Sequence, residues 1–133
     1  MGGWYLQPDC NLPSGESIIR QILLGLTYFR TKFGVRPTTA LNFDPFGHSR
    51  GLAQILAKTG YDSYLFCRPN QAQCSLEAED FTWVGYDGSG VRAHREVGFY
   101  NAPLGKADEK IKRYLTEHED REIGMVLWGV GNH

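Results

Sequence analysis

The stretch from residue 39 to residue 67 constrains the fold of this chain more than any other. An apolar lead-in at 39–41 enters a loop at 42–50, a helix-like run follows at 52–58, and a second apolar run of strand length occupies 64–67. A strand, a helix and a strand at this spacing form a βαβ unit, in which the strands are parallel and the crossover is right-handed. The fold class predicted for the chain is therefore α/β.

The loop at 42–50 contains a single carboxylate, that of Asp44. Pro45 fixes its own φ and disfavours the α region for the residue before it, which predicts that Asp44 is the last extended residue of the strand. Gly47 allows the loop to close where a side chain would clash. Ligands of α/β proteins collect beyond the carboxyl ends of parallel strands, so one interpretation of Asp44 is a functional carboxylate. An Asp-Pro turn whose carboxylate caps the next helix is the alternative.

Arg68 follows the second apolar run and precedes Pro69. Because the two strands of a βαβ unit run parallel, Arg68 and Asp44 are expected at the same edge of the sheet. A cation at that edge would keep the Asp44 carboxylate ionised. A solvated charge at the end of a strand is the alternative interpretation of Arg68.

The rest of the chain predicts further helices, a hairpin and two more strands. Ser14 is expected to cap a helix whose apolar residues recur at helical spacing from 18 to 29, and Gly34 to end it. Asp87 and Gly88, between two alternating runs, predict a β-hairpin. The remaining predicted elements are an initial apolar strand at 1–6, a charged helix at 107–119 with an apolar stripe of Ile111, Tyr114 and Leu115, and a buried strand at 123–130.

Composition and charge exclude several classes of function. The 133 residues suffice for one ordinary domain with one core. A net charge of −1 without a basic block gives no reason to expect nucleic acid as a partner. No apolar run approaches the length of a membrane span, so no membrane insertion is expected. The three cysteines, with no Cys-x-x-Cys pair, argue against a disulfide framework and favour a reducing compartment, here the cytoplasm.

The hexamer Asp-Pro-Phe-Gly-His-Ser at 44–49 resembles a motif of glycoside hydrolase family 38, the zinc-dependent α-mannosidases. The resemblance extends to Arg68 and to residues 2–4, 7–16, 83–89 and 128–133, so it covers nearly the whole chain. It implies a segment of the N-terminal catalytic domain, which in this family is a seven-stranded (β/α) barrel with parallel strands and crossover helices. Residues 1–133 would then be a single segment of that domain, and this segment would include the β-hairpin.

The resemblance also implies a role for three residues. Asp44 would be the nucleophile of a retaining α-mannosidase, attacking the anomeric carbon of a terminal α-linked mannose to form a covalent glycosyl-enzyme intermediate. The same carboxylate would be a zinc ligand. Phe46 would pack against the sugar and Arg68 would orient the nucleophile, with a mannose-containing glycan as the substrate.

Other parts of the family's site have no counterpart in this sequence. The family's further zinc ligands are a His-x-Asp pair upstream of Gly2 and a histidine downstream of His133, and zinc takes about four ligands. The acid/base would follow the strand at 125–128, where residues 131–133 contain no carboxylate; Asp9 is an outside candidate. The chain is therefore expected to be truncated at both ends and inactive alone, and to self-associate through exposed strand edges.

Two other functions stay open on the sequence. One is a metal-dependent carbohydrate deacetylase, because barrels of that class also place Asp and His residues at strand ends. The other is a non-catalytic sugar-binding module that uses Trp4, Phe46 and Trp83 as stacking platforms.

Overall fold

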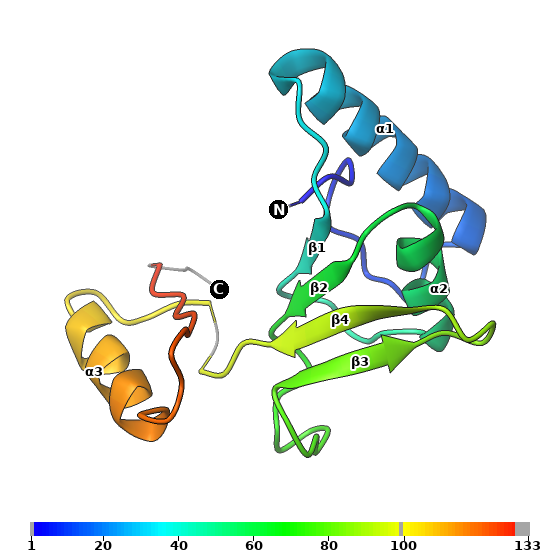
Figure 1. The fold of residues 1–133 in the computed structure, drawn as a ribbon. Coiled ribbons are helices and arrows are strands. Elements are labelled where there is room, and N and C mark those ends of the chain that lie inside the picture. Colours follow the sequence, from blue (N-terminus) through cyan, green and yellow to red (C-terminus); the bar gives the residue numbers. More distant parts are fainter. Residues whose placement is uncertain (1, 99, 130–133) are drawn as a thin grey trace. The chain divides into compact units, whose positions relative to one another are not determined.

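A computed structural model describes residues 2–98 and 100–129 (Figure 1). By its internal contacts the chain divides into two compact units, Met1–Arg95 and Glu96–His133, and each is described by itself. The elements of the first unit are α1 (Gly15–Phe33), β1 (Thr39–Asn42), α2 (Arg50–Lys58), β2 (Ser63–Phe66), β3 (Asp80–Val84) and β4 (Gly90–Arg95), and the second unit contains α3 (Ala107–Glu117).

The strands form one four-stranded sheet in the order β1-β2-β4-β3. Strand β2 pairs parallel with β1 on one side, with Asn42 opposite Phe66, and parallel with β4 on the other. Strands β3 and β4 pair antiparallel as a hairpin, and Gly88 in its turn has a φ of 82°. The α/β class, the βαβ unit and the hairpin are therefore confirmed. The sheet in the described residues is mixed and four-stranded, and it does not by itself show a seven-stranded barrel.

Helix α1 begins and ends where the sequence predicts. The side chain of Ser14 accepts a hydrogen bond from the backbone N–H of Ser17 at 3.2 Å, which satisfies one of the exposed amides of the first turn. Gly34 follows the last turn with a φ of 67°, and its N–H donates to the carbonyl of Arg30 at 3.0 Å. This left-handed position suits glycine because it has no Cβ to clash.

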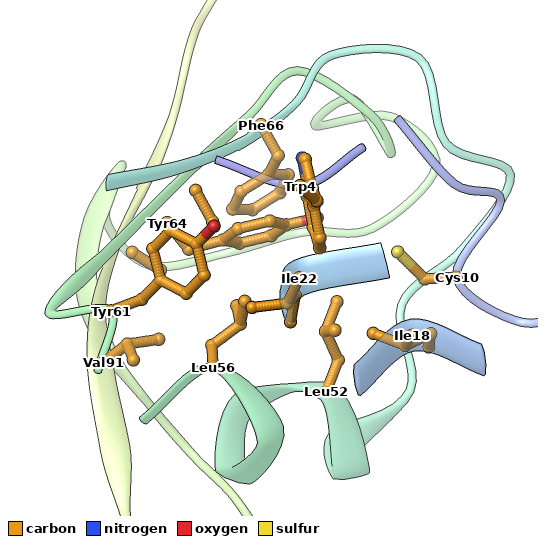
Figure 2. Packing of buried hydrophobic residues seen from close by; sticks show 12 residues of the cluster. Trp4, Cys10, Ile18, Ile22, Leu52, Leu56, Tyr61, Tyr64, Phe66 and Val91 are labelled. Carbon is orange, nitrogen blue, oxygen red and sulfur yellow. The ribbon is translucent and has the colours of Figure 1, made fainter. Parts of the chain in front are cut away.

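The core of the first unit lies between one face of the sheet and the two helices α1 and α2 (Figure 2). Leu52 and Leu56 of α2 face Ile22 of α1 and Tyr64 of β2, and all four are fully buried. Burying each leucine stabilises the fold by on the order of 2 kcal/mol. Cys67 is also buried, as predicted.

The strand predicted at the start of the chain does not form. Gly2 and Gly3 have φ angles of 94° and 105°, in a region that a β-strand does not occupy. The segment instead packs closely on α1, since a Cβ placed on Gly25 would lie 2.0 Å from the carbonyl oxygen of Gly3. The backbone N–H of Tyr5 donates to the carbonyl of Gln21 in the same helix at 3.0 Å. Residues 2–6 therefore form a packing segment rather than a strand.

In the second unit, the apolar stripe predicted for α3 is wrong in part. Tyr114 is buried as expected, but Leu115 is 61% exposed and Lys110 is buried in its place. The ammonium group of Lys110 donates to the carbonyl of Asn101 at 3.1 Å and to the carbonyl of Leu127. A buried lysine is tolerated because its donors have acceptors, and the helical spacing of apolar residues cannot reveal such acceptors.

The buried strand predicted at 123–130 does not form within the described residues, which end at 129. The segment makes one isolated bridge, between Asn101 and Gly129. The backbone of Leu127 is held by side chains instead: its N–H donates to the carboxylate of Glu96 at 3.2 Å, and its carbonyl accepts from Lys110. An apolar run becomes a strand only where a neighbouring strand offers a ladder. Residues 131–133, where a loop is predicted, lie outside the described residues.

Across the described helices, no segment is long and apolar enough to cross a membrane.

Candidate active site

The loop that carries Asp44 closes against residues 7–11. Strand β1 ends at Asn42, two residues before Asp44, so the prediction that Asp44 is the last extended residue is wrong. Gly47 has a φ of 145°, and a Cβ placed on it would lie 2.0 Å from the side-chain nitrogen of Asn11. The predicted need for glycine in this loop is therefore confirmed, and it arises from the positive φ, because the end of the Asn11 side chain could move aside.

Asp44 and Arg68 form an ion pair beyond the carboxyl ends of β1 and β2. The carboxylate oxygen Oδ1 of Asp44 lies 2.6 Å from Nε of Arg68, and the two side chains are 25% and 34% exposed. The N-cap position of α2 is occupied by Ser49, not by Asp44, so the helix-cap alternative does not describe this carboxylate. The prediction that the two residues meet at one edge of the sheet is confirmed.

Phe46 lies on the outside of the same loop and is 75% exposed. The guanidinium carbon of Arg68 lies 5.9 Å from the centre of its ring, within the range of a cation–π contact. Asp44, Phe46 and Arg68 thus form one cluster with a carboxylate, a cation and an exposed aromatic face. Such a cluster can hold a sugar, whose apolar face stacks on an aromatic ring while its hydroxyl groups bind charged and polar partners.

His48 ties the loop to the end of β2. Its Nε2 lies 2.6 Å from the carbonyl oxygen of Arg68, and its Nδ1 lies 3.0 Å from the hydroxyl of Tyr64. A carbonyl only accepts, so Nε2 carries the proton, and Nδ1 accepts from the Tyr64 hydroxyl. Burial lowers the pKa of His48, with the hydrogen bond to the Arg68 carbonyl acting in the opposite direction, and burial raises the pKa of Tyr64 well above its usual range. A neutral imidazole therefore braces the backbone of Arg68.

Asn42 provides a second brace, which the sequence did not reveal. It is fully buried, and its side-chain N–H group donates to the carbonyl of Pro8 at 2.9 Å and contacts the sulfur of Cys10 at 3.0 Å. The N–H of Phe43 donates to the side chain of Gln7 at 2.8 Å. Burial raises the pKa of the Cys10 thiol to about 11, so this sulfur is a neutral neighbour. A polar residue closing an otherwise apolar strand was the one signal that could have indicated this network.

Comparison with known proteins assigns this arrangement to a family. The family model described as the glycosyl hydrolases family 38 N-terminal domain matches residues 1–133. The chain belongs to glycoside hydrolase family 38.

Several members of family 38 are similar to the chain over almost all of it. Alpha-mannosidase G of Dictyostelium discoideum is 36% identical over 98% of the chain, and human alpha-mannosidase 2C1 is 34% identical over 99%. The alpha-mannosidase of Saccharomyces cerevisiae is 30% identical over 99%. The chain spans only 12% to 13% of the length of these relatives.

A solved structure shares the fold of this family 38 chain. The crystal structure of an alpha-mannosidase from Enterococcus faecalis V583 matches 97% of the chain and 16% of its own length, with a TM-score of 0.71 and 21% sequence identity. The arrangement of the sheet and helices is therefore that of a piece of a larger fold.

The zinc site that the family resemblance implies is not formed by the residues that the structure describes. Among residues 2–98 and 100–129, no group of three or more His, Cys, Asp or Glu side chains could hold a metal ion. The Asp44 carboxylate is paired with the guanidinium of Arg68. A tetrahedral zinc site requires about four donors, so the donor set described here does not fit zinc.

Two other expectations concern single residues of this family 38 chain. Trp4 is buried, and its indole N–H donates to the carbonyl of Leu41 at 2.9 Å, so its assignment as a sugar-stacking platform is wrong. Asp9 has one carboxylate oxygen, Oδ1, that is buried without a hydrogen-bond partner among the described residues. Its role as an acid/base stays a prediction.

Proposed function

We propose that this chain is the part of a retaining α-mannosidase that carries the nucleophile, Asp44, and that the enzyme hydrolyses terminal α-linked mannose in glycans. The observation that carries the proposal is the Asp44–Arg68 ion pair beyond the carboxyl ends of parallel strands in a family 38 chain. The Asp44 carboxylate is ion-paired with Arg68, His48 fixes the backbone of Arg68, and Asn42 fixes the start of the loop. The carboxylate therefore has few orientations open to it. Fixed orientation is what a nucleophile needs to attack at one carbon.

In the proposed reaction, a carboxylate oxygen of Asp44 bonds to the anomeric carbon while the glycosidic carbon–oxygen bond breaks. The leaving oxygen takes a proton from a general acid, and a mannosyl ester of Asp44 remains. Water then attacks the same carbon on the face opposite the ester bond and gives its proton to the conjugate base of the general acid. The bond between this carbon and the Asp44 oxygen breaks, which releases the free carboxylate and mannose of retained configuration. Arg68 orients the carboxylate through the ion pair, and the exposed ring of Phe46 offers a face for the sugar. No step is assigned to a metal ion, because the described residues do not form a zinc site.

The decisive experiment replaces Asp44 in the full-length enzyme that contains this segment. The Asp44→Asn variant should lose roughly 10⁴-fold in turnover of 4-nitrophenyl α-mannoside, because an amide does not form the ester intermediate. Asp120→Asn is the matched control, since this aspartate is exposed in the second unit, and it should turn over at the parental rate. When the reaction of the parental enzyme is quenched, mass spectrometry should find one added hexosyl group on the peptide that contains Asp44. An Asp44→Asn variant with the parental rate would refute the assignment.

The isolated chain should neither hydrolyse mannosides nor remain monomeric. Its described residues lack a zinc-ligand set, and strands β1 and β3 are the two outer strands of its sheet. Unpaired strand edges pair with other chains, so light scattering should show species larger than one chain as concentration rises. Hydrolysis of an aryl α-mannoside by the pure chain, or a monodisperse monomer at high concentration, would contradict these two expectations respectively.

A further inference from the structure

Arg95 is a buried cation at the carboxyl end of β4. It is 4% exposed and stands opposite Phe66 of β2 in the parallel register. Among the residues that the structure describes, no carboxylate pairs with its guanidinium, whose acceptors are all neutral. Burying a charge without an opposite charge costs free energy, and apolar residues often replace buried ions without loss of stability. Stability alone therefore does not account for an arginine at this position.

The guanidinium of Arg95 holds one loop, residues 69–76, which lies between β2 and β3. Its Nη1 donates to the carbonyl of Cys74 at 2.7 Å and to the carbonyl of Pro69 at 3.4 Å. Its Nη2 donates to the side-chain oxygen of Gln71. A guanidinium presents its donors in a planar fork of fixed directions, which the ammonium of a lysine does not have. One side chain therefore holds the loop at three points.

Hydrogen bonds within the loop join these points into one segment. The side chain of Gln71 accepts from the backbone N–H of Leu76 at 3.3 Å and donates to its carbonyl at 3.0 Å. The N–H of Gln73 donates to the side chain of Asn70 at 3.0 Å, and the N–H of Asn70 donates to the side chain of Gln73 at 3.1 Å. A guanidinium that fixes Gln71 therefore fixes the loop as a whole.

The loop begins directly after Arg68, the partner of Asp44. The carbonyl of Arg68 lies 2.6 Å from Nε2 of His48, and the carbonyl of the next residue accepts from Arg95. The backbone that carries the Arg68 side chain is thus held from two sides, by the Asp44 loop and by β4. Because Nε of Arg68 lies 2.6 Å from Oδ1 of Asp44, a shift of this backbone would change the orientation of the carboxylate.

We propose that Arg95 is a positioning residue of the α-mannosidase: by fixing the 69–76 loop, it fixes the place at which Arg68 meets Asp44. The role rests on the proposed function, since the orientation of this carboxylate matters only if Asp44 is the nucleophile. Arg95 acts through Arg68 and not on the sugar. A displacement of about 1 Å, caused by a substitution far from the reacting atoms, can cost on the order of 100-fold in rate.

The test replaces Arg95 by lysine in the full-length enzyme that contains this segment, which keeps the charge and removes the fork. The kcat for 4-nitrophenyl α-mannoside should fall about 10- to 100-fold while KM changes by less than about threefold, because the sugar still binds but the nucleophile is misplaced. Rates are taken on enzyme that elutes with the parent in gel filtration. Arg20→Lys, at a side chain that is 73% exposed, is the matched control and should keep both constants.

A double-variant cycle separates positioning from a loss of stability. In an Arg68→Ala background the ion pair with Asp44 is already absent, so adding Arg95→Lys should lower kcat by less than about twofold further. A residue that only stabilised the fold would lower the rate by the same factor in both backgrounds.

Gln71→Leu gives a milder test, because it removes one acceptor of the guanidinium at an exposed residue. It should lower kcat about three- to tenfold with KM unchanged. It also answers the question if Arg95→Lys does not fold.

Amide hydrogen exchange reports on the loop without reference to activity. Residues 70–76 should exchange faster in Arg95→Lys than in the parent, while β2 stays slow. Arg20→Lys should leave the exchange of both segments unchanged.

Three results would overturn the positioning role and leave the proposed function standing. They are a parental kcat in Arg95→Lys or Gln71→Leu, equal rate losses in the two backgrounds, and unchanged exchange of residues 70–76. A parental enzyme that hydrolyses no α-mannoside would instead refute the proposed function, and the positioning role with it.

Discussion

The two units of the chain hold their backbones in different ways. In the first, strands β1, β2 and β4 exchange backbone hydrogen bonds above a core of apolar side chains. In the second, the segment around Leu127 is tethered by the charged side chains of Glu96 and Lys110, both of them buried. In a β-ladder the backbone is held by many equivalent hydrogen bonds. In the second unit it is held by a few charged side chains, and burying each of them costs free energy of desolvation. Substitutions should therefore act through lost packing in the first unit and through lost partners in the second.

The largest effect is expected from the core of the first unit. Leu56→Ala should lower the free energy of unfolding by about 2–5 kcal/mol, because it removes a fully buried side chain and leaves a cavity. Leu115→Ala, the same substitution at an exposed position of α3, should change it by no more than about 0.5 kcal/mol. Urea unfolding of both variants measures the difference. Equal losses would mean that the second unit also relies on an apolar core.

A smaller effect is expected from the tether of the second unit. Lys110→Met should destabilise that unit by about 1–3 kcal/mol, because the carbonyls of Asn101 and Leu127 lose their donor. Amide hydrogen exchange at Leu127 should accelerate while that of β2 stays slow. Lys112→Met on the exposed side of the same helix is the control and should leave both unchanged. Faster exchange in β2 alone would contradict the tether.

The smallest effect is expected from a change of pH. Burial lowers the pKa of His48, so the unfolded chain binds a proton at this site more readily than the folded chain does. Stability from this residue is therefore fully present above a pH of about 6.5 and is lost as pH falls toward the folded pKa, by at most about 1.4 kcal/mol per pH unit.

The measurement compares urea midpoints at several pH values between neutral and mildly acidic for the parent and for His48→Gln, which keeps a side-chain donor for the Arg68 carbonyl. The decrease in the urea midpoint as pH falls should be smaller in the His48→Gln variant than in the parent, because one titrating histidine is absent. Parallel profiles would show that His48 is protonated equally in both states.

The sequence predicted well the features that depend on neighbouring residues. Helix α1 follows from Ser14 and Gly34, and the hairpin from Asp87 and Gly88, because caps and turns are decided over a few residues. The meeting of Asp44 with Arg68 was also predictable, although they are distant in sequence. A βαβ unit places the carboxyl ends of its two strands at one edge whatever its loops contain.

The features that the sequence did not predict depend on contacts between distant segments. Residues 123–129 have the apolar composition of a strand, but the hydrogen-bond partners of Leu127 are side chains that no pattern within the run identifies. The burial of Asn42 similarly depends on Pro8 and Cys10, which come more than thirty positions earlier. The roles proposed for Asp44, Phe46 and Arg68 rest on the family as well as on geometry, and they stay predictions.

The contact between Gly47 and Asn11 has a consequence for how this protein can be shortened. Residues 7–11 pack behind the Asp44 loop, although they belong to no helix or strand. A shortened chain that started at residue 14 would keep every strand of the sheet. The loop that carries Asp44 would nevertheless lose the segment it packs against, and the carboxylate would no longer have a fixed orientation. The minimal unit for a transplanted site therefore includes this irregular segment.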